Sequence, residues 1–393
     1  MIANCRAMEA TLAFSELRDS TWDVLVIGAG VAGASAAILL ARTGLKVLIV
    51  EAKKFPREKV CGGCLNQRAQ DSLARIGVLD ELMKHGAVVL NELQLQLPRT
   101  NVIWPMPKMI SVRRSTLDSL LVQTAIEAGA YFLPETQGQL IADKSDSDSG
   151  VRRVQLSNRE NIVQVEARCV IVADGLTRSS LRLESGWDTS VQPESRVGVQ
   201  AIAARSDFSK CDSQRLRMIV GKHGYVGISA VDGERVDIAA AIDPDFLKRM
   251  RGPGNAVRQV LNECGLHDLD INCELVWLAT PLLTRSSRQT AARRVFLLGD
   301  ALGYVEPFTG EGMSWALASA EAIVPIVTTT QSDWSDQLAN QWGQWVQHRS
   351  KASQRTCRLL SRCLRFPRIT AWMVYGCRWL PPLRRELMRR ASQ

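Results

Sequence analysis

The chain has 393 residues, of which 46% are hydrophobic and 23% charged, a balance typical of a globular protein with one or two domains. Its net charge of +9 is concentrated at the C-terminus: Arg349 to Gln393 hold twelve basic residues and one acid, and the preceding 348 residues carry a net −2. This composition excludes a largely disordered chain, and it directs the search for an anionic partner to the C-terminal segment.

The cysteines, the histidines and the apolar stretches argue against three further classes: a secreted disulfide-rich protein, a metalloprotein and a transmembrane protein. The ten cysteines are scattered and no apolar signal core begins the chain, which favours the reduced thiols of a cytoplasmic protein. The four histidines stand far apart without ligand spacing, so no metal site is expected. A transmembrane helix needs about 18 apolar residues, and the nearest candidate, Ile369 to Gly376, is less than half that length.

The clearest motif lies near the N-terminus. An apolar strand over 23–28 runs into Gly-x-Gly-x-x-Gly at 28–33, a helix is predicted over 34–43, and a second strand over 46–50 ends at an acid. In this pattern the glycines permit the turn, the approach of a pyrophosphate and close helix packing, while the acid accepts hydrogen bonds from ribose hydroxyls. The helix N-terminus faces the diphosphate. The predicted dinucleotide site comprises Gly28, Ala29, Gly30, Val31, Ala32, Gly33, Glu51 and Ala52.

A second motif follows an apolar strand over 295–298. It consists of a Gly-Asp pair, a glycine-rich loop that reaches residue 312 and a helix from Met313 to about Val327. A carboxylate at a strand end can accept hydrogen bonds from a ribityl chain, and helix N–H groups stabilise negative charge on a reduced flavin ring. Alone, the Gly-Asp pair fits an ordinary turn equally well. Together with the first motif it predicts FAD contacts at Gly299, Asp300, Gly310, Gly312 and Met313.

With these motifs the sequence resembles the FAD-dependent oxidoreductases of the aromatic-hydroxylase superfamily, and it is most similar to the branch of geranylgeranyl reductases and flavin-dependent halogenases. The resemblance implies an α/β fold in which a Rossmann-type, glutathione-reductase-like FAD-binding domain carries an inserted β-sheet substrate domain and a helical C-terminal tail. The branch's loop along the flavin matches residues 55–64 (FPREKVCGGC), which implies cofactor contacts from Arg57, Cys61, Gly62 and Gly63. The Cys-x-x-Cys spacing also fits a zinc or redox pair, but Gly-Gly between the thiols favours close backbone packing.

Two further segments match the resemblance. Residues 169–175 (CVIVADG) resemble the hydroxylases' second fingerprint, which implies that Asp174 and Gly175 contact FAD and take part when NADPH or NADH reduces it; a strand-ending turn is the alternative. The family's cofactor-facing arginine, four residues before an aspartate, matches Arg114, although a purely structural role fits equally well. Arg113 could instead face solvent, and Ser115 is the expected N-cap of the following helix.

Alternating polar and apolar residues over 88–110 and 196–290 predict strands of one sheet, which in the resembling proteins covers the flavin and forms the substrate pocket. Residues 143–150 (DKSDSDSG) predict a polar hairpin tip. The expected organisation is an N-terminal extension over 1–20, an FAD-binding domain over 21–87, 111–195 and 291–330, a substrate-binding sheet domain over 88–110 and 196–290, and a helical basic segment over 331–393.

Departures from the family patterns bear on the reaction. Gly303 stands where hydroxylases usually have a histidine, which favours the reductase branch. However, the reductases' Tyr-x-Trp-x-Phe-Pro-Lys motif is missing, because Tyr225 is followed by Val-Gly-Ile-Ser. The halogenases' Trp-x-Trp-x-Ile-Pro motif and a suitably placed lysine are missing as well, so halogenation is disfavoured.

Three functions stay open. The slightly favoured one is an NAD(P)H-dependent monooxygenase that hydroxylates an aromatic or lipophilic substrate, such as a secondary metabolite, through a flavin C4a-hydroperoxide. The second is reduction of carbon–carbon double bonds in a polyprenyl lipid, and the third is electron transfer to a partner protein. Because the cofactor carries the chemistry, no catalytic triad is expected. Pro307 would border the ring by resemblance, and Glu306 and Glu311 are candidate proton donors if they are buried.

The C-terminal segment combines arginines with Leu and Trp. Arg355, Arg358, Arg362 and Arg365 recur at three- and four-residue steps, which fits a helix that lies on anionic lipid at the inner face of a membrane. The alternative is a helical cap that packs on the body of the protein. Nucleic acid is disfavoured as a partner, because the flavin-type fold explains the rest of the chain.

Overall fold

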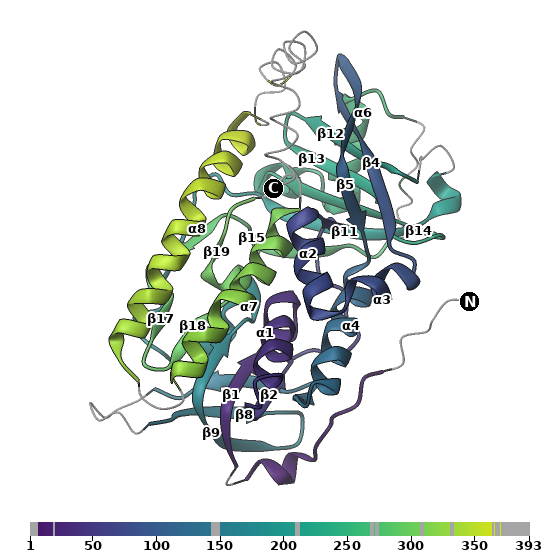
Figure 1. Ribbon diagram of the computed structural model, residues 1–393. Coiled ribbons are helices and arrows are strands. Elements are labelled where there is room, and N and C mark those ends of the chain that lie inside the picture. The colour runs from purple at the N-terminus through teal and green to yellow at the C-terminus, as the bar shows by residue number, and fades with distance from the viewer. Residues whose placement is uncertain are drawn as a thin grey trace.

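The computed structural model describes residues 7–18, 20–142, 150–208, 213–267, 271, 275–306, 310–330, 334–363, 365 and 370. Within these residues the strands form two eight-stranded sheets and one three-stranded sheet. In Figure 1 the first large sheet occupies the lower half of the view, the second lies at the upper right, and α8 (Asp336–Cys363) runs along the left side. The chain therefore has the two-sheet organisation that the sequence predicts.

The first sheet has a parallel centre around β1 (Thr21–Ile27). This strand pairs in parallel with β2 (Val47–Val50) on one side and with β9 (Ile162–Val172) on the other. Two further parallel strands and an antiparallel extension complete the sheet: β6 (Tyr131–Leu133), β18 (Val295–Leu297), β17 (Ala291–Ala292), β7 (Gln137–Leu140) and β8 (Arg152–Ser157). Parallel strands end at one edge of a sheet, which is where ligands bind in such folds.

Both faces of this sheet are covered, and so β1 is apolar and buried from Val24 to Ile27. Val24 and Val26 face the helical layer of α1 (Val31–Ala41), α4 (Arg114–Glu127) and α7 (Glu311–Thr330). Leu25 and Ile27 face the opposite way, toward the β7–β8 extension. The predicted helices at 34 and 313 begin slightly earlier in the structure, at Val31 and Glu311.

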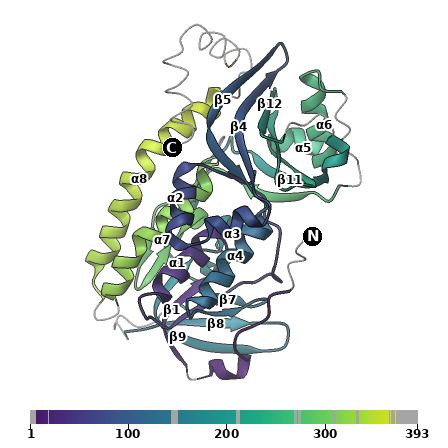
Figure 2. The ribbon, with the colours of Figure 1, turned by 45° about the vertical axis from the view of Figure 1, so that its right-hand side comes forward.

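The second sheet joins two distant stretches of the chain. Its β4 (Val88–Leu97) pairs in parallel with β12 (Arg215–Gly221) and antiparallel with β5 (Thr100–Ser111). The other strands are β3 (Cys64–Leu65), β11 (Val197–Ala204), β13 (Gly224–Ala230), β14 (Arg235–Ile242) and β15 (Leu278–Leu282). Helices α5 (Pro244–Arg249) and α6 (Pro253–Glu263) cover its outer side, as Figure 2 shows.

The remaining elements connect these layers. They are α2 (Gln67–Ile76), α3 (Leu79–Lys84), the short strands β10 (Thr189–Val191), β16 (Arg285–Ser287) and β19 (Gly303–Tyr304), and the 3-10 turns at 14–17, 175–177, 179–181, 205–208 and 299–302. At the N-terminus, the Met8 amide donates to the Phe55 carbonyl over 3.1 Å, so the extension packs on the first domain. Apart from Gly150, the predicted hairpin tip over 143–150 lies outside the described residues, while its flanking strands β7 and β8 do pair.

The C-terminal segment is described only in part. Helix α8 supports the predicted helical segment, but the side chains of Arg355, Arg358 and Arg362 lie outside the description. Arg365 is described: it lies 3.8 Å from the Asp243 carboxylate and donates to the Glu194 carbonyl. At least one arginine of this segment thus packs on the body of the protein. None of the described helices is long and apolar enough to cross a bilayer.

Candidate cofactor and substrate site

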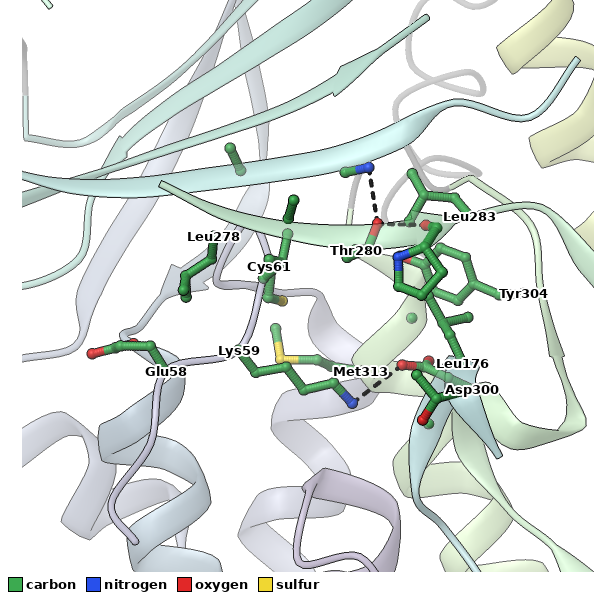
Figure 3. Close-up of a pocket in the computed structure, with 18 of the residues that line it drawn as sticks. Glu58, Lys59, Cys61, Leu176, Leu278, Thr280, Leu283, Asp300, Tyr304 and Met313 are labelled. Atoms are coloured by element: carbon green, nitrogen blue, oxygen red, sulfur yellow. Dashed lines mark hydrogen bonds and ion pairs between the residues drawn. The ribbon is translucent and has the colours of Figure 1, made fainter. Parts of the chain in front are cut away.

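A cavity of about 630 Å³ lies between the two large sheets. Strand ends of the first sheet supply one wall, with Gly28, Glu51 and Asp300, and the second sheet supplies an apolar wall that includes Val199 and Met218. A smaller cavity of about 60 Å³ at the start of α1 shares lining residues with it, so the two form one groove. Figure 3 shows Lys59, Asp300 and Met313 across the cavity from Leu278, Thr280 and Leu283.

The turn between β1 and α1 has the close packing that the glycine motif predicts. Gly28 has φ +105°, and a methyl group on it would lie 2.5 Å from the Ala173 carbonyl oxygen. A methyl group on Gly33 would lie 2.0 Å from the Gly28 carbonyl oxygen. Both positions exclude a side chain, and α1 consequently starts directly at the strand end, with its free N–H groups toward the smaller cavity.

The start of α1 also gathers positive charge. A methyl group on Gly30 would lie 3.6 Å from Arg57 Nη2, 3.9 Å from Arg114 Nη2 and 4.0 Å from Lys59 Nζ. Three cationic side chains therefore surround the point where a helix N-terminus already favours an anion. These residues fit the diphosphate of a dinucleotide, and the groove that continues from them past Asp300 fits the rest of an FAD molecule.

Glu51, at the end of β2, belongs to a buried ionic network. Its carboxylate accepts hydrogen bonds from the amides of Ala29 and Lys53, each at 3.1 Å, and from Arg57 Nη2 at 3.0 Å. Arg57 also donates to Asp118 at 3.1 Å. The carboxylate therefore anchors the glycine turn and the loop over 55–64. Its predicted contact with ribose hydroxyls stays a prediction.

Arg114 completes this network at the start of α4. It donates to both oxygens of Asp118 at 3.0 Å, it is buried, and it lines the smaller cavity. Arg113 does not simply face solvent, because it pairs with Glu58. The predicted N-cap role of Ser115 is wrong: Arg113 occupies the N-cap, and the Ser115 hydroxyl donates to Glu58 over 3.0 Å. The helix begins one residue before Ser115, at Arg114, so Ser115 lies inside its first turn.

Asp174 and Gly175 follow β9 at the same edge and line the cavity. Asp174 Oδ2 accepts from the Ser180 amide at 2.9 Å and from the Ser179 hydroxyl at 3.4 Å, whereas Oδ1 has no partner among the described residues. Burial raises the pKa of this carboxyl group. The turn is therefore built around a half-buried acid that lines the cavity, which an ordinary strand-ending turn does not require.

Asp300 lies on the 3-10 turn that follows β18. Its carboxylate is 3.4 Å from Lys59 Nζ, and both side chains remain partly exposed to the cavity (Figure 3). Gly310, Gly312 and Met313 line the same wall at the start of α7. Glu311 is buried there, and Pro307 lies outside the described residues. The segment thus presents a carboxylate and a helix start to one groove.

Cys61 and Cys64 are free thiols at the end of the loop over 55–64, hereafter the cofactor loop, and both line the cavity. Burial raises the pKa of the Cys64 thiol, so it stays protonated and is a poor nucleophile or metal ligand. Among the described residues, no three His, Cys, Asp or Glu side chains stand together as a metal site would need. The loop thus fits backbone packing along a ligand.

Glu306, a candidate proton donor from the sequence if buried, is buried, but sequence reasoning missed the polar chain on the substrate side to which it belongs. Tyr225 on β13 lines the cavity and hydrogen-bonds the buried Glu306 carboxyl group. Arg196, which is 1% exposed, lies 3.2 Å from Glu306 and 2.9 Å from Asp243. Burial raises the pKa values of both Tyr225 and Glu306. The chain of contacts leads from the cavity to Asp243, which His223 approaches to 3.6 Å near the surface.

The structure brings most of the predicted cofactor residues to one groove. The larger cavity is lined by Gly28, Glu51, Ala52, Arg57, Cys61, Gly62, Asp174, Gly175, Asp300, Gly310, Gly312 and Met313. The smaller cavity is lined by Gly30, Val31, Ala32, Arg114 and Gly299. Neither cavity is lined by Ala29, Gly33 or Gly63, whose contributions are to the backbone packing behind the groove.

The groove agrees with comparisons to known proteins. The sequence model of the family described as FAD binding domain matches residues 21–330. Menaquinone reductase of Mycobacterium tuberculosis is 28% identical over 375 residues, which cover 89% of this chain and 86% of that protein. Digeranylgeranylglycerophospholipid reductase 2 of Methanothermobacter thermautotrophicus is 27% identical over 312 residues, 76% of each chain.

Solved structures share the fold. PqsL of Pseudomonas aeruginosa, "a probable FAD-dependent monooxygenase", superposes with a TM-score of 0.73 over 90% of this chain and 99% of its own, at 20% identity. At that identity the likeness concerns the fold alone.

Proposed function

The chain belongs to the FAD binding domain family, and we propose that this FAD-dependent oxidoreductase reduces a carbon–carbon double bond of an isoprenoid lipid. Two relatives that are similar over most of the chain support the substrate class, since their names specify menaquinone and a digeranylgeranyl phospholipid. The sequence alone slightly favoured hydroxylation. The names of the reductase relatives are our reason for preferring double-bond reduction.

The apolar wall of the cavity is the observation that carries this proposal. The lining residues from β11, β12 and β14 include Val199, Leu216, Met218 and Ala240, and the wall continues to Leu278 and Leu283. Such a surface suits an isoprenoid chain and excludes water from the reacting bond. Among the described residues that line the cavity from these strands, none carries a charge.

Double-bond reduction also needs a proton, and the structure offers a source. When bound, reduced FAD supplies two electrons and one hydrogen to the substrate. Tyr225 is the titratable side chain among the lining residues of β11 to β15. Its raised pKa keeps the hydroxyl protonated at neutral pH, and Glu306 and Arg196 hold it in place. We assign the second hydrogen to the Tyr225 hydroxyl. Glu306, whose pKa is raised by burial, can return a proton to the resulting phenolate, and solvent at the Asp243 end of the chain of contacts can restore the proton of Glu306.

A product analysis tests the reaction. Purified FAD-loaded protein, NADPH or NADH as the proposed electron donor, and either menaquinone or a geranylgeranyl lipid are incubated with and without oxygen. Quinols are reoxidised in air before mass spectrometry, so that hydrogens added to the side chain are counted separately from those on the ring. We expect a product with two additional hydrogens in both atmospheres. Electron uptake by the quinone ring alone would contradict the proposal.

Monooxygenation is the second candidate. It is favoured by Asp174 and Gly175, which match the hydroxylase fingerprint and line the cavity, and it would use the same apolar wall. A product that gains one oxygen atom, and forms only in air, would establish it. Flavin reduction that requires another protein would instead indicate electron transfer, the third function that the sequence leaves open.

Contact with a membrane surface is a further part of the proposal, because an isoprenoid lipid must reach the cavity from a bilayer. The twelve basic residues from Arg349 onward supply the charge for an anionic surface. We expect the chain to sediment with vesicles that contain phosphatidylglycerol but not with neutral ones, and a chain without residues 350–393 to lose this binding. Equal sedimentation of the two chains would contradict the assignment, provided that both melt at similar temperatures.

A further inference from the structure

A pair of buried polar residues joins the substrate sheet to the cofactor loop. We propose that Gln200 and Asp237 form a clamp that positions the Cys61–Gly62 backbone against the flavin, so that the substrate sheet sets the geometry of the cofactor site. The inference rests on FAD binding by this chain and is independent of whether the reaction is reduction or hydroxylation.

Gln200 makes the direct contact. Its side-chain amide donates to the Cys61 carbonyl at 2.9 Å and accepts from the Cys61 amide at 3.3 Å, so it pairs with the peptide on both sides of this residue. Gln200 is 3% exposed and comes from the middle of β11, whereas Cys61 and Gly62 line the cavity. A fully buried amide with two such bonds fixes the loop backbone more firmly than apolar packing can, since breaking either bond leaves a buried polar group unsatisfied.

Asp237 fixes the orientation of that amide. Its Oδ1 accepts the second hydrogen of Gln200 Nε2 at 2.7 Å, which keeps Nε2 toward the Cys61 carbonyl and Oε1 toward the Cys61 amide. Strand register supports this geometry, because Asp237 on β14 lies opposite Ile202, two residues from Gln200 on the same face of β11. Asp237 therefore acts through Gln200 and is a positioning residue.

Surrounding groups hold Asp237 in its neutral form. Burial is the main cause that raises its pKa to about 8, and the nearby Glu58 carboxylate adds to the effect. The groups that face it are Gln200 from β11, Ser229 from β13, and Glu58 and Cys64 from the cofactor-loop side. Its Oδ2 has no partner among the described residues, and a methyl group on Gly63 would lie 3.5 Å from it. Deprotonation would thus place a negative charge directly behind the cofactor loop.

Four variants test the clamp, with FAD alone as the ligand. Gln200→Leu and Asp237→Leu remove the hydrogen bonds, Asp237→Asn keeps a neutral acceptor next to Gln200, and Asp188→Asn is a control on an exposed aspartate. FAD affinity, the visible spectrum of bound FAD and its reduction midpoint potential are measured at pH 7, and melting of the FAD-free proteins establishes that each variant is folded.

We expect both leucine variants to bind FAD at least tenfold more weakly and to shift its spectrum or midpoint potential, while Asp237→Asn and Asp188→Asn match the wild type. In the wild type, the spectrum of bound FAD should change with a midpoint near pH 8, and this change should be absent from Asp237→Asn. A folded Gln200→Leu protein with wild-type affinity, spectrum and potential would overturn the clamp. If Asp237→Leu does not fold, the Gln200→Leu variant and the pH titration of the wild type still test the clamp. Because no lipid is present, failure here is separable from failure of the proposed reaction.

Discussion

The two walls of the cavity are built in different ways. The cofactor wall is ionic: Glu51, Arg57, Asp118 and Arg114 form a chain of contacts of 3.0–3.1 Å beneath a glycine turn. The substrate wall is mostly apolar, with two isolated polar clusters around Tyr225 and Asp237. The difference indicates that binding of a charged cofactor depends on many coupled ionic groups. On the substrate wall, by contrast, the polar interactions come from a few side chains. Substitutions in the two walls should accordingly have different signatures.

The largest effect is expected from Gly33→Ala on the cofactor wall. The added methyl group would lie 2.0 Å from the Gly28 carbonyl oxygen, so α1 must move away from β1. We expect a loss of about 3 kcal/mol or more in the free energy of unfolding, together with loss of bound FAD. Chemical denaturation measures this. Gly233→Ala is the control, because nothing lies within 4 Å of a methyl group there; equal stability of the two variants would contradict the packing of the turn.

Arg114→Leu tests whether the ionic network acts as a unit. The substitution leaves the fully buried Asp118 with Arg57 as its remaining ionic partner. We expect destabilisation of about 3 kcal/mol, the usual result of breaking a buried pair, and weaker FAD binding. Arg75→Leu is the matched control: its pair with Glu321 is solvent-exposed, so its loss should change the free energy of unfolding by less than about 1 kcal/mol. Similar losses in both variants would mean that burial does not distinguish the two pairs.

On the substrate wall, Tyr225→Phe should affect turnover rather than binding. We expect a decrease of about 100-fold in kcat with unchanged FAD content, as is typical of a lost general acid. Tyr131→Phe, at an exposed position on the first sheet, should behave as the wild type. A Tyr225→Phe enzyme with full turnover would remove the proton-donor assignment and leave the apolar wall in place.

The smallest effect is the pH dependence that Asp237 contributes. In the unfolded chain an aspartate loses its proton near pH 4, whereas the folded protein holds it to about pH 8. Between these values the folded state binds more protons, so its contribution to stability falls as the pH rises. Asp237→Asn should remove this slope. Its free energy of unfolding relative to that of the wild type should therefore rise by about 1 kcal/mol for each pH unit between roughly 5 and 7. Parallel stability–pH curves for the two proteins would show that Asp237 is ionised when folded.

Comparison of the two walls also explains what could be predicted from the sequence. The FAD-type α/β fold was predicted correctly because the turn from Gly28 to Glu51 is encoded within one contiguous strand–helix–strand unit. Arg114 and Asp118 are four residues apart on α4, a spacing that allows the ion pair seen in the structure. Local patterns of this kind are sufficient for most of the cofactor wall.

The substrate wall depends on contacts between distant residues. Gln200 and Cys61 are 139 positions apart, and Arg196 and Glu306 are 110 apart, so no local pattern reveals either pair. A signal was nevertheless present: Gln200 is the single polar residue of the strand VGVQAIAA, and Asp237 is the single polar residue that follows Arg235 in the strand RVDIAAAI. The N-cap prediction for Ser115 failed for a different reason: α4 begins at Arg114, so Ser115 lies inside its first turn.

The most direct test of the proposed function follows the flavin itself in the absence of oxygen. The FAD-loaded protein is reduced, mixed anaerobically with menaquinone or a geranylgeranyl lipid in detergent micelles, and monitored by flavin absorbance. Double-bond reduction predicts that one of these lipids reoxidises the flavin without oxygen and gains two side-chain hydrogens for each flavin oxidised. A flavin that stays reduced with both lipids, and is reoxidised only when oxygen is admitted, would contradict it.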